Sequence, residues 1–71
     1  MKESELPTLN GLLCFEATVR HGSMTLAAED LGITQPLVSQ RIRALEDVVG
    51  GILIDRSKKP VTPTVEGLKY Y

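Results

Sequence analysis

The sequence has little of several residue types, and each shortage excludes something. It holds one cysteine among 71 residues, so no disulfide forms within the chain and the reducing cytosol suits it. Its aromatic residues are only Phe15, Tyr70 and Tyr71, which leaves the core to aliphatic side chains. No apolar stretch near the start predicts a signal peptide, and no run approaches the roughly 20 apolar residues of a membrane helix.

Catalytic and metal-binding patterns are also missing. No nucleophile has a neighbouring base, and no phosphate-binding glycine loop or cluster of metal ligands is visible. We expect Cys14 and His21 on the outer face of a first helix, opposite its core stripe. They would lie about 10.5 Å apart along the axis, too far to share a metal ion. The sequence predicts no enzyme, no metal and no cofactor.

Helical spacing of apolar residues predicts a first helix. Thr8 is a suitable N-cap, and the helix is expected to run to about His21. Its inner stripe consists of Leu12, Phe15 and Val19. The polar segment before it, residues 1–7, is expected to be a loosely attached arm.

Two further helices are predicted at 24–31 and 35–49, joined by a tight turn at Gly32. The longer helix has a buried stripe formed by Val38, Ile42, Leu45 and Val49. A short helix, a glycine turn and a longer helix with a polar outer face predict a helix-turn-helix.

The outward face of the longer helix carries the candidate base-reading residues, which are Gln35, Pro36, Ser39, Gln40 and Arg43. Glutamine pairs with adenine, arginine pairs with guanine, and a proline ring contacts a thymine methyl group. Solvated helix faces are polar by default, so the face alone leaves DNA contact and simple exposure both open.

A β-favouring run follows a Gly-Gly pair. Residues 52–56 and 61–63 flank Ser-Lys-Lys-Pro, which predicts a two-stranded hairpin with a basic tip. Pro63 cannot donate to a ladder, so the second strand must be short or lie at an edge. We expect Leu53, and also Val61, to hold this hairpin against the helices.

The whole pattern resembles the N-terminal DNA-binding domain of LysR-type bacterial transcriptional regulators. The resemblance begins with the run FxxxVxxGSxTxAAxxLxxTQPxVSxxIxxLE, from Phe15 to Glu46. It continues in the family's order and spacing through Leu53, Arg56, Val61, Thr64 and Gly67. The similarity therefore covers the chain from about Leu9 to its end.

This resemblance implies a mainly α fold: a three-helix winged helix-turn-helix with a small two-stranded β wing and the start of a linker helix. It divides the chain into an arm (1–7), a DNA-binding domain (8–63) and a truncated linker helix (64–71). Helix 35–49 is expected in the major groove of double-stranded DNA, with wing 53–63 on the backbone or minor groove. The expected target is an interrupted inverted repeat, read in the bacterial nucleoid by a cytoplasmic, homo-oligomeric regulator.

Backbone contacts are expected from two groups of residues. In the family, the arginine matched by Arg56 and the wing tip with Lys58 and Lys59 approach the DNA backbone or minor groove. Hydroxyls at helix starts suit a phosphate, although they are also ordinary N-caps. These are Ser23, Thr25 and Thr34.

Net charge is the unfavourable feature, because it is −1 and DNA-binding domains are usually basic. Up to Ile33 there are two basic and five acidic residues, whereas from Thr34 onward there are six basic and four acidic ones. Asp47 shares the reading face and is expected to lie beyond the groove. The acidic balance supports an alternative function as a protein-interaction module.

As the linker helix is a stub, the fragment itself is expected to be a monomer or weak dimer.

Overall fold

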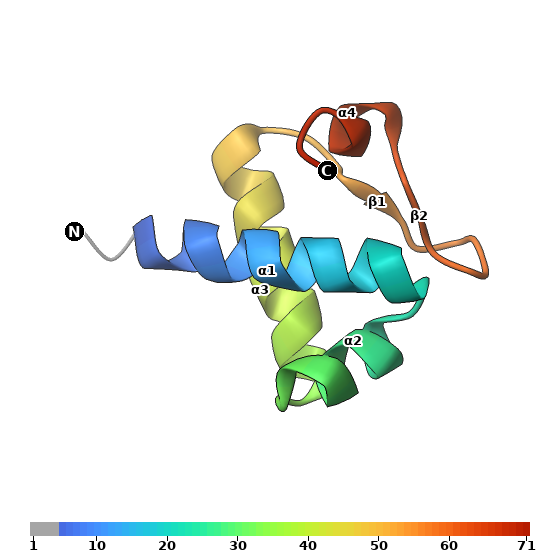
Figure 1. Cartoon of the computed structure of the whole chain (residues 1–71). Helices are drawn as coiled ribbons and strands as arrows, with labels where there is room; N and C mark the ends of the chain where they lie inside the picture. The colour runs from blue at the N-terminus through green and yellow to red at the C-terminus, as the bar shows by residue number, and fades with distance from the viewer. Residues whose placement is uncertain (1–4) are drawn as a thin grey trace.

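The computed structural model describes residues 5–71, with side chains from Leu9 onward. Its elements are α1 (Glu5–His21), α2 (Met24–Leu31), α3 (Gln35–Val49), β1 (Ile54–Asp55), β2 (Thr62–Pro63) and α4 (Val65–Leu68). Figure 1 shows α1 crossing α3, with α2 below the crossing and the two strands beside it. The predicted three-helix winged fold with a two-stranded wing is confirmed. Within residues 5–71, no helix is long and apolar enough to cross a bilayer.

The start of α1 differs from the prediction. The helix begins at Glu5, so Thr8 lies inside it and is not its cap. Pro7 falls in the first turn, where a backbone N–H has no intrahelical partner to lose. Residues 5–7 of the predicted arm are thus helical, and its first four residues lie outside the described part.

The buried face of α1 is also rotated from the predicted stripe. Phe15 is in the core as expected, whereas Leu12 and Val19 are only partly buried. Cys14, expected on the outer face, is 1% exposed and belongs to the core cluster. Burial raises the pKa of the Cys14 thiol, with a smaller opposing effect from the Arg41 guanidinium.

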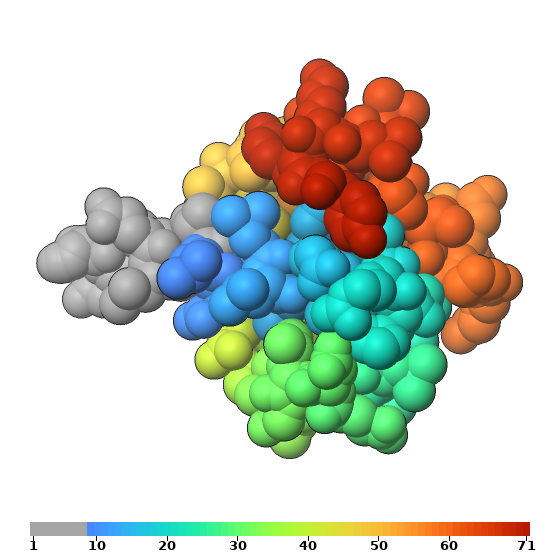
Figure 2. Space-filling view, in the orientation of Figure 1, coloured from blue at the N-terminus to red at the C-terminus, as the bar shows by residue number. Residues whose placement is uncertain are grey.

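This rotation has a structural cause, because α1 is covered on more than one side. It packs on α2 and α3, and the C-terminal residues lie over it as well (Figure 2). The Tyr71 ring meets the Phe15 ring edge to face, with centroids 6.1 Å apart and an interplanar angle of 86°. A single predicted stripe underestimates the buried surface of a helix in this position.

The helix-turn-helix forms largely as predicted. Ser23 caps α2 by accepting a hydrogen bond from the Leu26 backbone N–H. At its other end Gly32 has φ 73°, and the Ile33 N–H reaches the Ala28 carbonyl, as in a Schellman motif. Thr34 occupies the N-cap position of α3, but its hydroxyl makes no capping bond within the described residues.

An ion-pair cluster on the surface links α1 to α2. Arg20 lies 2.8 Å from the Glu16 carboxylate and 3.1 Å from the Asp30 carboxylate, and His21 is also 3.1 Å from Asp30. The hydrogen bond from Arg20 lowers the pKa of Glu16, and those from His21 and then Arg20 lower the pKa of Asp30. Because these groups are exposed, their contribution to stability is small.

The crossing of α1 on α3 requires a residue without a side chain at Gly11. A Cβ at this position would lie 2.7 Å from the Leu45 Cβ and 2.9 Å from the Arg41 carbonyl oxygen. The backbone of α1 therefore approaches α3 more closely than any larger residue permits.

We predict that Gly11→Ala destabilises the domain. In an exposed helix interior, replacing glycine with alanine stabilises a protein by about 1 kcal/mol. A loss of stability in Gly11→Ala would therefore identify the close crossing of α1 on α3. Overpacking against Leu45 should lower the free energy of unfolding by about 1–3 kcal/mol. Urea denaturation measures this, with Asn10→Ala as the control on the same helix. A Gly11→Ala protein as stable as the control would contradict the packing argument.

Candidate nucleic-acid interface

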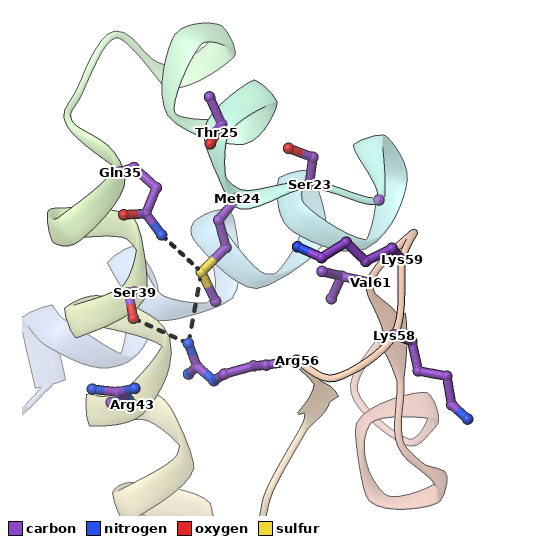
Figure 3. A pocket seen from close by; sticks show the side chains of 11 residues that line it. Ser23, Met24, Thr25, Gln35, Ser39, Arg43, Arg56, Lys58, Lys59 and Val61 are labelled. Carbon is purple, nitrogen blue, oxygen red and sulfur yellow. Dashed lines mark hydrogen bonds between the residues drawn. The ribbon is translucent and has the colours of Figure 1, made fainter.

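A groove of about 400 Å³ lies between the start of α2, the outward face of α3 and the wing. Figure 3 shows the side chains around it converging from these three elements. Its lining residues are Gly22, Ser23, Met24, Thr25, Gln35, Ser39, Arg43, Arg56, Lys58, Lys59 and Val61. The fold thus gathers most of the predicted site residues in one concave surface.

The predicted base-reading residues share one face of α3. Gln35, Pro36, Gln40 and Arg43 are exposed there, whereas Ser39 is partly buried. All five line a second open hollow of about 560 Å³, which is continuous with the first groove through Gln35, Ser39 and Arg43. These side chains present amide, hydroxyl and guanidinium groups of the kind that pair with base edges.

Asp47 lies on the same outward face of α3, as expected. It lines the second hollow with Gln40 and Arg43. Asp47 is four residues after Arg43 on α3, which places both side chains on the same helix face. Its carboxylate adds negative charge at this end of the surface, and this charge would repel a phosphate.

Arg56 binds within the protein, although it is a predicted DNA-backbone residue. Its Nη1 donates to the Ser39 Oγ at 3.0 Å and contacts the Met24 Sδ at 3.6 Å. Its Nη2 lies 3.6 Å from the Glu46 carboxylate and has no hydrogen-bond partner of good geometry among the described residues. Arg56 therefore connects the wing to α3, and its side chain is only 30% exposed.

Glu46 anchors the wing from inside the domain, and the sequence reasoning did not single it out. It is 7% exposed, and its Oε2 accepts the Leu53 backbone N–H at 2.9 Å. Buried carboxylates require such partners, because desolvation of an unpaired charge costs several kcal/mol. The signal was present, since Glu46 follows Val38 and Ile42 at intervals of four and so falls within the buried stripe of α3.

The wing is an antiparallel pair in which Ile54 faces Pro63 and Asp55 faces Thr62. Leu53 and Ile54 are buried, and Val61 packs against the core cluster, as predicted for Leu53 and Val61. The predicted limit on the second strand is also confirmed, because β2 has two residues.

Two contacts place the wing tip beside the helices. The Val61 N–H donates to the Gly22 carbonyl at 2.9 Å, which ties the tip to the turn between α1 and α2. Lys58 and Lys59 are exposed at the tip, with Lys58 3.9 Å from the Asp55 carboxylate. The Ser57 hydroxyl and backbone N–H lower the pKa of Asp55. Since Asp55 lies close to Lys58, the charge of Lys58 is partly compensated, and the charge of Lys59 is less so.

The predicted helix-start hydroxyls separate into two groups. Ser23 and Thr25 line the groove at the start of α2, although the Ser23 oxygen already accepts a capping bond. Thr34 is exposed at the start of α3, yet it lines neither the 400 Å³ groove nor the second hollow. The groove also contains Met24, which lies between Gln35 and Arg56 and was not among the predicted residues.

Comparison with known proteins gives consistent matches. A family model described as bacterial regulatory helix-turn-helix protein, lysR family, matches residues 9–68. The glycine cleavage system transcriptional activator of Escherichia coli K12 is 46% identical over 66 residues, which are 93% of this chain and 22% of that protein. The RuBisCO operon transcriptional regulator of Allochromatium vinosum is 44% identical over 64 residues, 90% of this chain and 21% of that protein. The chain thus spans about a fifth of these relatives.

Solved structures agree with the sequence matches. The DNA-binding domain of BenM in complex with catB site 1 DNA has a TM-score of 0.84 and 41% identity, covering 89% of this chain and 68% of that one. Vibrio fischeri DarR in complex with DNA has a TM-score of 0.82 and 39% identity, covering 86% of this chain and 21% of that one.

We predict that Glu46→Ala loosens the wing and destabilises the domain. The change leaves the Leu53 N–H and the Arg56 guanidinium without their buried partner, at a cost of about 1–3 kcal/mol in unfolding free energy. Glu46→Gln is the matched control, because its amide oxygen still accepts from Leu53 and the loss should be smaller. Urea denaturation and protection of the Leu53 amide from hydrogen exchange measure the effect. Equal stability of Glu46→Ala and the wild type would disprove the anchoring role.

Proposed function

Because this chain belongs to the LysR family of bacterial regulatory helix-turn-helix proteins, we propose that it is the DNA-reading domain of a transcriptional regulator. Its partner is double-stranded DNA, which it binds sequence-specifically. The observation that carries the proposal is the shared groove, in which the polar face of α3 and the cationic wing tip face the same space. The proposal is supported by relatives that are transcriptional regulators and by similar domains solved with DNA.

In this function α3 enters the major groove with its outward face against the base edges. Gln35 and Arg43 provide amide and guanidinium groups that discriminate bases, while Pro36 contacts a thymine methyl group. Ser39 accepts from Arg56, so its hydroxyl hydrogen remains free to donate to a base. Gln40 lies farther along the same face.

The wing and the helix starts contact the sugar-phosphate backbone. Lys58 and Lys59 lie at the exposed tip, where they neutralise phosphates and position the domain without reading sequence. Ser23, Thr25 and Thr34 serve as hydrogen-bond donors at the helix starts. Arg56 acts mainly through Ser39 and Glu46, and it approaches DNA only with its exposed part.

One copy of the domain should bind DNA weakly. The whole chain has a net charge of −1, and phosphate neutralisation supplies most non-specific affinity. A regulator built on this domain gains affinity by placing two copies on an interrupted inverted repeat, with reading helices about one turn of DNA apart. We assign residues 64–71 to the start of the linker that joins such copies in a homo-oligomeric regulator. This regulator works in the cytoplasm, at the bacterial nucleoid, and has no catalytic role.

The first test is selection from random DNA duplexes at low and moderate salt. We expect a preferred half-site, with Gln35→Ala and Arg43→Ala each losing about 1–3 kcal/mol of discrimination at one position. Lys59→Ala should weaken all sequences alike and reduce the salt slope by about one. Lys69→Ala, which removes the same charge from the residue that follows α4, is the matched control.

The alternative, a protein-interaction module, makes a different prediction for these experiments. It expects no enriched sequence, and Arg43→Glu would leave partner binding intact. Fusing two copies through a coiled coil and repeating the selection separates a weak monomer from a domain that does not read DNA. A fused protein that still enriches no sequence would exclude the proposed function.

We also predict that the 71-residue chain is a monomer or weak dimer in solution. α4 spans only Val65–Leu68, which is too short to form a helical dimer interface. Sedimentation equilibrium at micromolar concentration measures the association. A tight dimer in this measurement would refute the expectation.

A further inference from the structure

We propose that Met24 sets the direction in which Gln35 presents its amide to DNA, and thereby determines which bases Gln35 selects. The inference rests on the proposed function, because it concerns the orientation of one base-reading side chain. Three atoms in the groove carry it: the Met24 sulfur, the Gln35 amide nitrogen and an Arg56 guanidinium nitrogen (Figure 3).

Met24 is the first residue of α2, and its sulfur points across the groove toward α3 and the wing. The Sδ lies 3.5 Å from the Gln35 Nε2 and 3.6 Å from the Arg56 Nη1. The same Nη1 donates to the Ser39 hydroxyl at 3.0 Å, which holds the guanidinium in place. The thioether therefore receives two donors from two other elements of the fold.

A thioether accepts hydrogen bonds and has no hydrogen to donate. The glutamine amide is nearly symmetric in shape, so its two orientations differ mainly in which neighbours are donors and acceptors. An acceptor at the inner side of the Gln35 amide favours the orientation with nitrogen inward and oxygen outward. Figure 3 shows this arrangement, with the Gln35 oxygen on the side away from Met24.

An outward oxygen restricts the bases that Gln35 pairs with. In the major groove the exocyclic amino groups of adenine and cytosine donate, whereas guanine O6 and thymine O4 accept. The second hydrogen on Nε2 stays free and reaches adenine N7 in a bidentate pair. Gln35 therefore selects an amino-bearing base, with adenine ahead of cytosine. Met24 is a positioning residue that enforces this choice without contacting the base.

The sequence offers a precise way to remove the sulfur alone. Met1 and Met24 are the only methionines, so protein produced with norleucine in place of methionine changes one side chain in the described structure. Norleucine replaces the sulfur with a methylene of similar size and removes the acceptor. Met24→Leu is the genetically encoded counterpart, and thermal melts of both proteins establish that the fold is retained.

The first measurement is the NMR spectrum of the side-chain amides without DNA. Loss of the sulfur should shift the Gln35 amide protons, while the Gln40 amide, which has no contact with Met24 among the described hydrogen bonds, stays in place as the internal control. An unchanged Gln35 signal in the norleucine protein would overturn the proposal at its structural step. This measurement does not depend on DNA binding.

The second measurement compares duplexes that differ at the base read by Gln35. We expect wild type to bind the adenine duplex more tightly than the guanine duplex. In both sulfur-free proteins the ratio of these two affinities should be about two- to tenfold smaller. Preferences at the base read by Arg43 should remain. In a Gln35→Ala background, Met24→Leu should cause no further loss of discrimination, since Met24 acts through Gln35.

The outcomes separate this inference from the proposed function. A preference that disappears in Gln35→Ala but persists in both sulfur-free proteins would overturn the role of Met24 and leave DNA reading intact. If wild type shows no preference that depends on Gln35, both DNA reading by this residue and the role of Met24 are wrong.

Discussion

The buried carboxylate of Glu46 is the interaction on which the geometry of the groove depends. A carboxylate that is 7% exposed needs hydrogen-bond donors, and here they come from the chain that follows α3. The Leu53 N–H and the Arg56 guanidinium both approach it, so the first strand of the wing must run beside the helix. Because Arg56 also reaches Ser39, the same arrangement fixes the distance between the wing and the reading face.

This arrangement divides the cationic residues by their tasks. Arg56 uses its guanidinium inside the protein, whereas Arg43, Lys58 and Lys59 keep their charges on the surface of one groove. A chain with a net charge of −1 can therefore present positive charge locally, because the lining of the 400 Å³ groove includes Arg43, Lys58 and Lys59 and, within residues 5–71, no acidic residue. The Glu16 and Asp30 carboxylates lie elsewhere, where they pair with Arg20. Local charge, and not the total, is what an approaching DNA backbone encounters within a Debye length of about 8–10 Å.

Stability depends on how closely the layers approach one another. Gly11 allows α1 to cross directly against Leu45 of α3, and Gly67 allows α4 to lie on the Leu53 carbonyl, where a Cβ would overlap the oxygen. The Phe15 ring is then covered from the other side by Tyr71. In a domain that buries only about 60% of its unfolded surface, these close contacts provide packing that a small core otherwise lacks.

The sequence by itself determined the features that depend on neighbouring residues. The spacing of Val38, Ile42 and Leu45, together with glycines such as Gly32, predicts α2 and α3 with the bounds that the structure has. The turn chemistry likewise predicts the wing. Caps, turns and periodic faces are local, so the order of residues is sufficient to specify them.

Only the tertiary structure decided which surfaces meet. The burial of Cys14 follows from the segments that cover α1, and the internal role of Arg56 follows from a hydrogen bond to a residue 17 positions away. The position of Met24 between α3 and the wing has the same origin. Hydrogen bonding and burial depend on distances between segments that are remote in sequence, and the periodicity of a single helix contains no information about them.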